Sequence, residues 1–274
     1  MNCRLKDILF FVPVVVLLTA VPGISRAGFI TLETTTEVTA AADQAKVLVT
    51  LVNKGNEPAY NTRISIVFAS KRYGGALKKR LGIGERYTEE FTLNAAMKRP
   101  GRYPLPVTVD YSDANLYPFS ALSIGYVDYV KSMPGGISGE IPEIVVSDSG
   151  EGEVIIRDSD PVKRMVSCAL VSSRDIAIEQ PLKAIAVGPG MSTTIPFHLK
   201  SLSGRNGSKY AVFAILEYDD NEYHYSNAVQ GMVRVESSRF TKKYRRYLLA
   251  VMIALFLIVF LYNIKGFRKH AARN

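Results

Sequence analysis

The feature that most constrains this chain is a pattern of short apolar runs that alternate with polar residues. Residues 47–52 (VLVTLV), 62–68 (TRISIVF) and 103–111 are examples, and Gly, Pro, Asn or Asp clusters separate them. Alternation with period two places the apolar side chains on one face of a strand. About seven such runs, with a turn every ten residues or so, predict an antiparallel β-sandwich. No stretch of residues 28–236 has a helical period.

The second half of this region repeats the first. Residues 82–93 match residues 188–199 at a spacing of 106, and residues 103–113 match residues 210–220 at a spacing of 107. A single small gap accounts for the register, which indicates two tandem copies of one domain. Four tyrosines fall at matching places and are expected in the core or at strand corners: Tyr103, Tyr111, Tyr210 and Tyr218.

The C-terminal stretch 247–264 reads YLLAVMIALFLIVFLYNI and contains no charged side chain. Eighteen helical residues span about 27 Å, close to the thickness of the hydrocarbon core of a bilayer. The sequence therefore predicts an all-β protein with one C-terminal transmembrane α-helix. Basic residues that suit lipid headgroups flank the span on both sides: Lys242, Lys243, Arg245, Arg246, Lys265, Arg268 and Lys269.

The N-terminus has the pattern of a secretory signal peptide. Arg4 and Lys6 precede an apolar run, and residues 25–27 (SRA) end in a small residue before Gly28. Cleavage is expected after residue 27, and an uncleaved signal anchor is the alternative. In both cases the body lies outside the cytoplasm and the C-terminal tail inside. Removal of the tail by a sorting enzyme is a further alternative, which the mass of the mature protein would test.

These patterns divide the chain into consecutive segments. Residues 132–142 are rich in Gly, Pro and Ser and are expected to form a linker without buried residues. The short juxtamembrane connection is expected to hold the second copy near the bilayer and to leave the first copy outermost. The predicted segments are a signal peptide (1–27), a first sandwich (28–131), the linker (132–142), a second sandwich (143–236), the juxtamembrane connection (237–246), the transmembrane helix (247–264) and a cytoplasmic tail (265–274).

The net charge of +9 belongs to the ends of the chain. Residues 1–27 carry three basic and one acidic residue, and residues 242–274 carry eight basic and none acidic. Residues 28–241 are left with 23 basic and 24 acidic residues, which argues against nucleic acid as a partner. Cys168 is the only cysteine after the signal peptide and lies in an apolar run, so it is expected to be a buried small hydrophobe.

Residues 49–64 (VTLVNKGNEPAYNTRI) resemble the second and third strands of bacterial and archaeal Ig-like envelope domains of the cell-adhesion-related (CARDB) type. The shared pattern is a strand, then Asn-x-Gly, then Pro or a small residue, then Asn before the next strand. The resemblance covers most of residues 45–130 and only the latter half of the second copy. It implies two tandem Ig-like β-sandwiches in an envelope protein, and it implies no reaction.

Catalytic and metal-binding motifs are scarce. The acidic turn 217–222 (EYDDNE) could offer oxygen ligands to Ca²⁺, although Asp-Asp-Asn between two strands also suits a hairpin turn. His198 and His224 lack the neighbours of a zinc site and are expected on strand faces. Nucleophile elbows, phosphate loops and dinucleotide fingerprints do not occur. We therefore expect neither an enzyme nor a bound cofactor.

A basic stretch in the first copy, residues 71–80 (KRYGGALKKR), is the main candidate for a contact site. One interpretation is a loop that binds an anionic polymer, lipid headgroups or an acidic partner; a solvated hairpin is the other. Lys98, Arg99 and Arg102 are expected near it. The predicted contact residues are Lys71, Arg72, Lys78, Lys79 and Arg80.

Together these features predict a single-pass protein of the cytoplasmic membrane with an extracytoplasmic body. Its expected role is non-catalytic binding or scaffolding through contacts with another envelope or membrane protein. A carbohydrate- or envelope-polymer-binding module, with a glycan as the ligand, is the alternative. The bilayer itself is the remaining expected partner.

Overall fold

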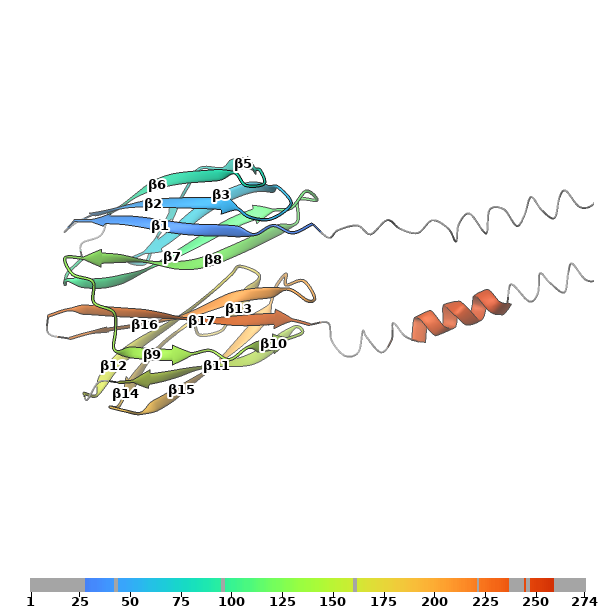
Figure 1. The fold of residues 1–274 in the computed structure, drawn as a ribbon. Helices are drawn as coiled ribbons and strands as arrows, with labels where there is room; N and C mark the ends of the chain where they lie inside the picture. Colours follow the sequence, from blue (N-terminus) through green and yellow to red (C-terminus); the bar gives the residue numbers. More distant parts are fainter. Residues whose placement is uncertain are drawn as a thin grey trace, which may run out of the picture.

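The computed structural model describes residues 28–41, 44–94, 97–159, 162–220, 222–236, 244 and 247–258. The described chain is mostly β and forms sandwich-like sheets, which confirms the predicted fold class at that level (Figure 1). The predicted signal peptide, most of the juxtamembrane connection and the tail lie outside the described residues.

The first half of the chain contributes two sheets that share one core. One sheet has the order β1-β2-β6, and the other pairs β8 with β7, β7 with β3, and β3 with both β4 and β5. The strands are β1 (Leu32–Ala40), β2 (Gln44–Asn53), β3 (Ala59–Phe68), β4 (Lys71–Gly74), β5 (Lys78–Leu81), β6 (Arg86–Asn94), β7 (Gly101–Ser112) and β8 (Pro118–Tyr129).

The second half repeats this plan. One sheet has the order β13-β15-β11-β9, and the other runs β14-β12-β16-β17, with β10 added beside β17. The strands are β9 (Ile137–Glu140), β10 (Ile144–Val146), β11 (Ser149–Asp158), β12 (Arg164–Ser172), β13 (Ile176–Ile178), β14 (Leu182–Val187), β15 (Ser192–Ser201), β16 (Lys209–Asp219) and β17 (His224–Val235).

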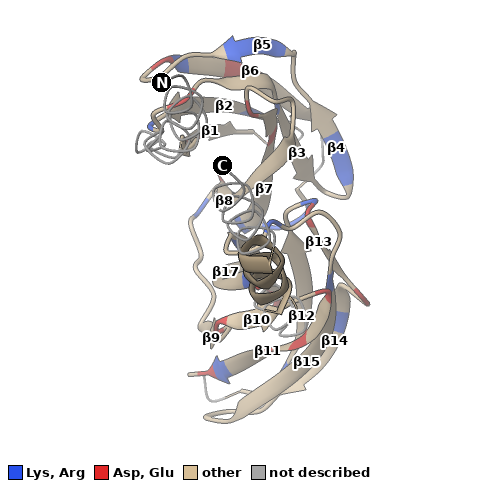
Figure 2. Ribbon diagram, turned by 90° about the vertical axis from the view of Figure 1, so that its right-hand side faces the viewer, with Lys and Arg blue, Asp and Glu red and all other residues tan. Residues whose placement is uncertain are grey.

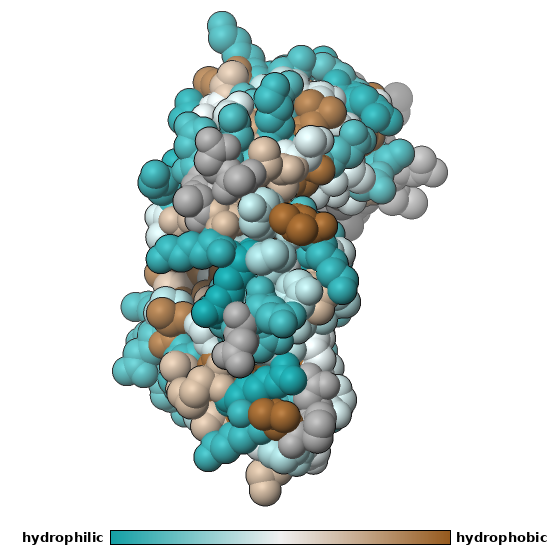
Figure 3. Space-filling model, turned by 90° about the vertical axis from the view of Figure 1, so that its left-hand side faces the viewer, coloured by the Kyte–Doolittle hydropathy of each residue, from teal (hydrophilic) through white to brown (hydrophobic). Residues whose placement is uncertain are grey.

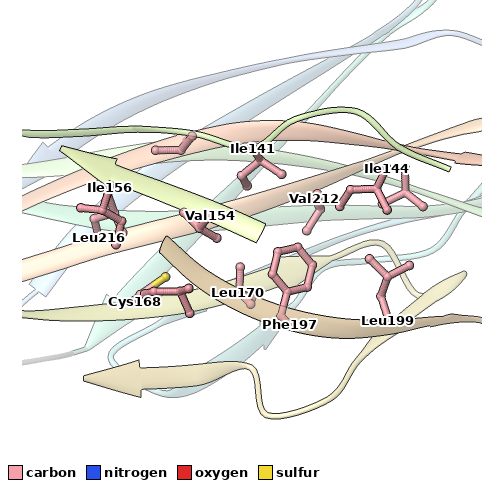
Figure 4. Packing of buried hydrophobic residues seen from close by; sticks show 14 of the residues in the cluster. Ile141, Ile144, Val154, Ile156, Cys168, Leu170, Phe197, Leu199, Val212 and Leu216 are labelled. Carbon is pink, nitrogen blue, oxygen red and sulfur yellow. The ribbon is translucent and has the colours of Figure 1, made fainter. Parts of the chain in front are cut away.

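Alternating residues of facing strands fill two separate buried clusters. Val47, Val49 and Leu51 of β2 belong to the first cluster and are fully buried. The second cluster includes Phe197 and Cys168, which lie among Val, Ile and Leu side chains of both sheets (Figure 4). Because each cluster draws on strands of one half only, the period-two pattern of the sequence translates directly into two cores.

The turns of the two copies also match. Gly84 and Gly190 precede equivalent strands, and their φ angles are +70° and +67°. Residues other than glycine rarely adopt this backbone region, which explains why both copies have glycine there. The tyrosines match as well, since the Tyr103 hydroxyl bonds to the backbone of Arg99 and the Tyr210 hydroxyl to that of Arg205.

The prediction that residues 132–142 form a linker without buried residues is wrong, because about half of this segment belongs to the second sandwich. β9 pairs with β11 at the edge of a sheet. Ile137 is 1% exposed and Ile141 is 5% exposed. Their spacing of four residues, among Gly, Ser and Glu, was too sparse to read as a strand.

The first copy, expected to be the outermost, lies beside the second copy and not beyond it. The two sandwiches lie side by side, and His224 of β17 pairs with Gly101 of β7 between them (Figure 1). β1 begins and β17 ends at the same end of the body. The opposite end is mostly hydrophilic, with isolated apolar groups (Figure 3). Both sandwiches therefore present one end toward the chain termini.

A helix covers residues 247–258, and all twelve of its side chains are exposed. The remaining predicted span, residues 259–264, lies outside the described residues. Within the described part of the chain, no helix is long and apolar enough to cross a membrane.

Candidate functional site

The predicted basic contact residues do not form a loop. Lys71 and Arg72 lie on β4, and Lys78, Lys79 and Arg80 lie on β5, and both strands pair with β3 at the edge of a sheet (Figure 2). Only residues 75–77 connect the two strands. The sequence pattern was misleading because charged residues dominate a strand whose outer edge faces water.

Lys78 has partners within its own sandwich. Its Nζ atom lies 2.8 Å from Glu85 Oε1 and 5.7 Å from the ring centre of Tyr87. The contact with Lys78 is the main cause that lowers the pKa of the Glu85 carboxyl. Lys71, Arg72, Lys79 and Arg80 are exposed. The basic stretch is thus a charged strand edge, while the predicted membrane flanks, Lys242, Lys243, Arg245, Arg246, Lys265, Arg268 and Lys269, lie outside the described residues.

The acidic turn 217–222 uses its carboxylates within the protein. Asp220 Oδ1 accepts two backbone N–H groups of the same turn, at 2.8 and 2.7 Å. Glu217 and Asp219 both contact the imidazole of His224, at 3.2 and 2.7 Å. Among the described residues, no group of three or more His, Cys, Asp or Glu side chains could hold a metal ion. The arrangement is that of a hairpin turn next to an ion-paired histidine.

His224 lies at one end of the junction between the sandwiches. Its ring stacks on Tyr103 of the first sandwich, with 4.2 Å between ring centres and 12° between planes. Its backbone N–H donates to Pro100 O at 2.9 Å. Arg99 reaches across to Asp219, with 3.1 Å between Nη1 and Oδ2. This end of the junction therefore combines an aromatic stack, a backbone hydrogen bond and an ion pair.

The environment of His224 favours its charged form. Burial lowers the pKa of the imidazole, but hydrogen bonds and charges from Glu217 and Asp219 outweigh burial and hold the pKa above its usual value. The side chain is only 13% exposed. A protonated His224 can bind both carboxylates and still stack on Tyr103.

Hydrogen bonds join the sandwiches at the other end of the junction. Ser120 Oγ accepts from the backbone N–H of Arg174 at 2.9 Å. The Tyr117 hydroxyl donates to Ser203 O at 3.0 Å. The guanidinium of Arg205 lies over the ring of Tyr117, 4.3 Å from its centre. These contacts pair the start of β8 with the loops before β13 and β16.

Apolar packing occupies the middle of the junction. Alternate residues of β16 point into the second core, and Phe213 and Ile215 point to the opposite face. Both side chains are nevertheless buried: Phe213 is 8% exposed and Ile215 is 3% exposed. Neither side chain belongs to the two core clusters. β8 of the first sandwich lies next to β16 (Figure 1). The first sandwich therefore covers the outer face of β16.

A groove of about 640 Å³ opens beside these contacts. Tyr111 and Phe119 line it from the first sandwich, and Arg205 and Lys209 line it from the second. Burial raises the pKa of the Tyr111 hydroxyl to about 12. Since its walls come from both halves, the groove depends on the docked arrangement.

Sequence reasoning missed the junction. Arg99 and Arg102, expected beside the basic stretch, lie at the junction end of β7, where Arg102 pairs with Asp128 at 3.0 Å. One signal was present: residues 211–216 (AVFAIL) are apolar without alternation, as expected for a strand buried on both faces. His198 is exposed on β15, as expected, 3.6 Å from Glu151.

Comparison with known proteins gives no family. No family model matches the chain, and no curated protein matches it. Among solved structures, E. coli alpha-2-macroglobulin matches with a TM-score of 0.30 and 12% identity over 74% of this chain. Red sea bream transglutaminase matches with a TM-score of 0.25 and 13% identity over 72% of this chain. The chain spans 17% and 31% of the length of these two proteins, respectively.

Proposed function

We propose that this chain is a membrane-anchored, non-catalytic binding or scaffolding protein of the cell envelope that acts through protein–protein contacts. Its body would be two tandem Ig-like sandwiches, as the resemblance to CARDB-type domains implies. It would lie outside the cytoplasm, with the C-terminal tail inside.

The observation that carries the proposal is the helix at residues 247–258. It reads YLLAVMIALFLI and is apolar on every side. The side chains of Leu248, Met252 and Ile258 are 66%, 62% and 62% exposed. A helix that is apolar all round needs an apolar environment, and no part of the described body covers this one. A bilayer supplies that environment if the helix continues through the predicted span.

The body fits a scaffolding role. Contacts at both ends of the junction hold the two sandwiches side by side, so their exposed edges keep a fixed relation to each other. The termini leave from one end, and the opposite hydrophilic end points away from them (Figures 1 and 3). An anchored body of this shape would present strand edges to neighbouring envelope proteins.

The anchor can be tested with Val251→Arg and Leu255→Arg together. Each arginine near the middle of a membrane helix costs about 2.5–3.5 kcal/mol on insertion scales. We expect the double variant to leave the membrane fraction under carbonate extraction. Val251→Leu with Leu255→Ile is the matched control and should remain. Retention of the arginine variant in protein whose signal peptide has been removed would contradict the anchor.

The binding role needs a second experiment. The full chain should be crosslinked in native membranes and purified, with recovery of a stoichiometric envelope or membrane protein as the expected result. Purification of the chain alone, together with binding to defined oligosaccharides, would favour the glycan-binding alternative instead.

A further inference from the structure

The outer edge of β14 (Leu182–Val187) is unpaired. β14 is the last strand of its sheet and pairs with β12 on one side. Within the described residues, no strand pairs with its other side. In an antiparallel ladder, every second residue of an edge strand turns its N–H and C=O groups away from the sheet. β14 therefore offers a row of backbone donors and acceptors.

The duplication supplies an internal comparison. Leu81 and Val187 are both fully buried and stand 106 residues apart, which aligns β5 with β14. Residues 78–80 (KKR) of β5 then correspond to residues 184–186 (AIA) of β14. Lysine and arginine on an edge strand discourage pairing with another chain. The first sandwich has this protection at residues 78–80, and the equivalent residues 184–186 of the second carry no charge.

The face beside the β14 edge is mostly apolar. Cross-strand pairs on the outer side of the sheet are Met165 with Ala186, Ser167 with Ala184, and Ala169 with Leu182. Met165 is 63% exposed and Leu182 is 65% exposed. Lys183, the only charged residue of β14, lies on the other face and donates to Pro196 O at 2.8 Å. A strand added at this edge would continue the sheet and could pack apolar side chains against this face.

We propose that β14 is the docking site for an extended segment of a different envelope polypeptide, which adds to the sheet as a further strand. This inference rests on the proposed binding function, and it adds that the partner binds as an extended strand. Backbone hydrogen bonds would supply the contact along the strand, and alternate apolar side chains of the segment would cover Leu182 and Met165.

Geometry disfavours antiparallel pairing of β14 with the β14 strand of a second copy of this chain. The long strands run toward the end of the body at which β1 begins and β17 ends (Figure 1). Antiparallel pairing of two β14 strands would point the two sets of termini in opposite directions. Two copies anchored in one membrane cannot adopt that arrangement.

The test uses the full chain in native membranes. The photoreactive residue p-benzoylphenylalanine replaces Leu182, Ala184 or Ala186 in turn, all three exposed on the outer face. If a strand docks, the crosslinked position on the partner should move by about two residues at each step, because every second residue of a strand faces the same way. Crosslinks without this progression, crosslinks to a second copy, or the absence of protein adducts would overturn the proposal.

A charge variant provides the second arm. Ala184→Lys with Ala186→Arg copies onto β14 the protection that β5 has. With the photoreactive group at position 182, we expect the adduct yield to fall about tenfold or more. Thr92→Lys with Asn94→Arg places the same charges on exposed positions of β6, another edge strand, and should leave the yield unchanged. Equal yields from both variants would refute the site.

The outcomes separate this inference from the proposed function. A stoichiometric partner that crosslinks from position 77 on the first sandwich but not from β14 would refute the site and leave the binding role standing. Failure to recover any protein partner, by crosslinking or by purification, would refute both.

Discussion

At Gly101 the backbone of the first sandwich pairs with that of the second, and Gly101→Ala should weaken the docking of the two sandwiches. The residue has a φ of +148°, in a region that side chains other than glycine rarely adopt. A Cβ atom there would lie 1.9 Å from His224 O and 2.8 Å from both His224 N and C. These are backbone atoms, so a rotamer change cannot relieve the clash.

The cost follows from two effects. Forcing alanine into this backbone region costs about 1–3 kcal/mol. Moving the strands apart sacrifices the hydrogen bond from His224 N–H to Pro100 O, at 2.9 Å, which contributes about 0.5–1.5 kcal/mol. The sum is about 2–4 kcal/mol. For a body of this size, 1 kcal/mol shifts the Tm by roughly 2–4 °C, so a fall of about 5–15 °C is expected.

Scanning calorimetry of the full chain in detergent measures this effect, and small-angle scattering should show a more open body. Gly74→Ala is the matched control, because Gly74 has an ordinary φ and nothing within 4 Å of a new Cβ atom. A Tm for Gly101→Ala within about 1 °C of the Gly74→Ala value would refute the reasoning, since that corresponds to less than 0.5 kcal/mol.

Three further changes test the electrostatics and the core. Glu217 and Asp219 raise the pKa of His224 above its usual value near 6.5, so its stabilising contribution is full below that pH and is lost as the pH rises through the raised pKa. The Tm should therefore fall as the pH rises above about 6.5, and His224→Gln should flatten this dependence. Burial raises the pKa of the Cys168 thiol to about 11, so maleimide should label this cysteine only after the protein unfolds. Peptide mass mapping identifies the labelled position, and rapid labelling of the native protein would contradict the burial of Cys168. Asn53 is fully buried, and its side chain makes three hydrogen bonds to backbone groups. Asn53→Ala should therefore lower the free energy of unfolding, measured with denaturant, by about 2–4 kcal/mol. A decrease below about 0.5 kcal/mol would show that these hydrogen bonds contribute little to stability.

Local patterns predicted the elements of the body well. The alternation over residues 47–52 is the inner face of β2, and Thr88, Phe91 and Leu93 share a strand position with Thr194, Phe197 and Leu199. These predictions succeeded because the period of a strand and the backbone needs of glycine act within a few residues. Residues 137–141 failed for the same reason, because two isolated isoleucines give too short a pattern.

The chain by itself determined that there would be two similar β units, each with its own buried core, because duplication and alternation are written in the order of residues. The tertiary structure decided how those units lie: side by side, with Phe213 and Ile215 covered and His224 stacked on Tyr103. It also placed the charged residues 78–80 on one edge strand and the uncharged residues 184–186 on the equivalent edge strand of the second sandwich. Contacts at the junction join residues that lie between 54 and 123 positions apart in the sequence. They depend on how two folded surfaces pack together, and a local residue pattern carries no information about that packing.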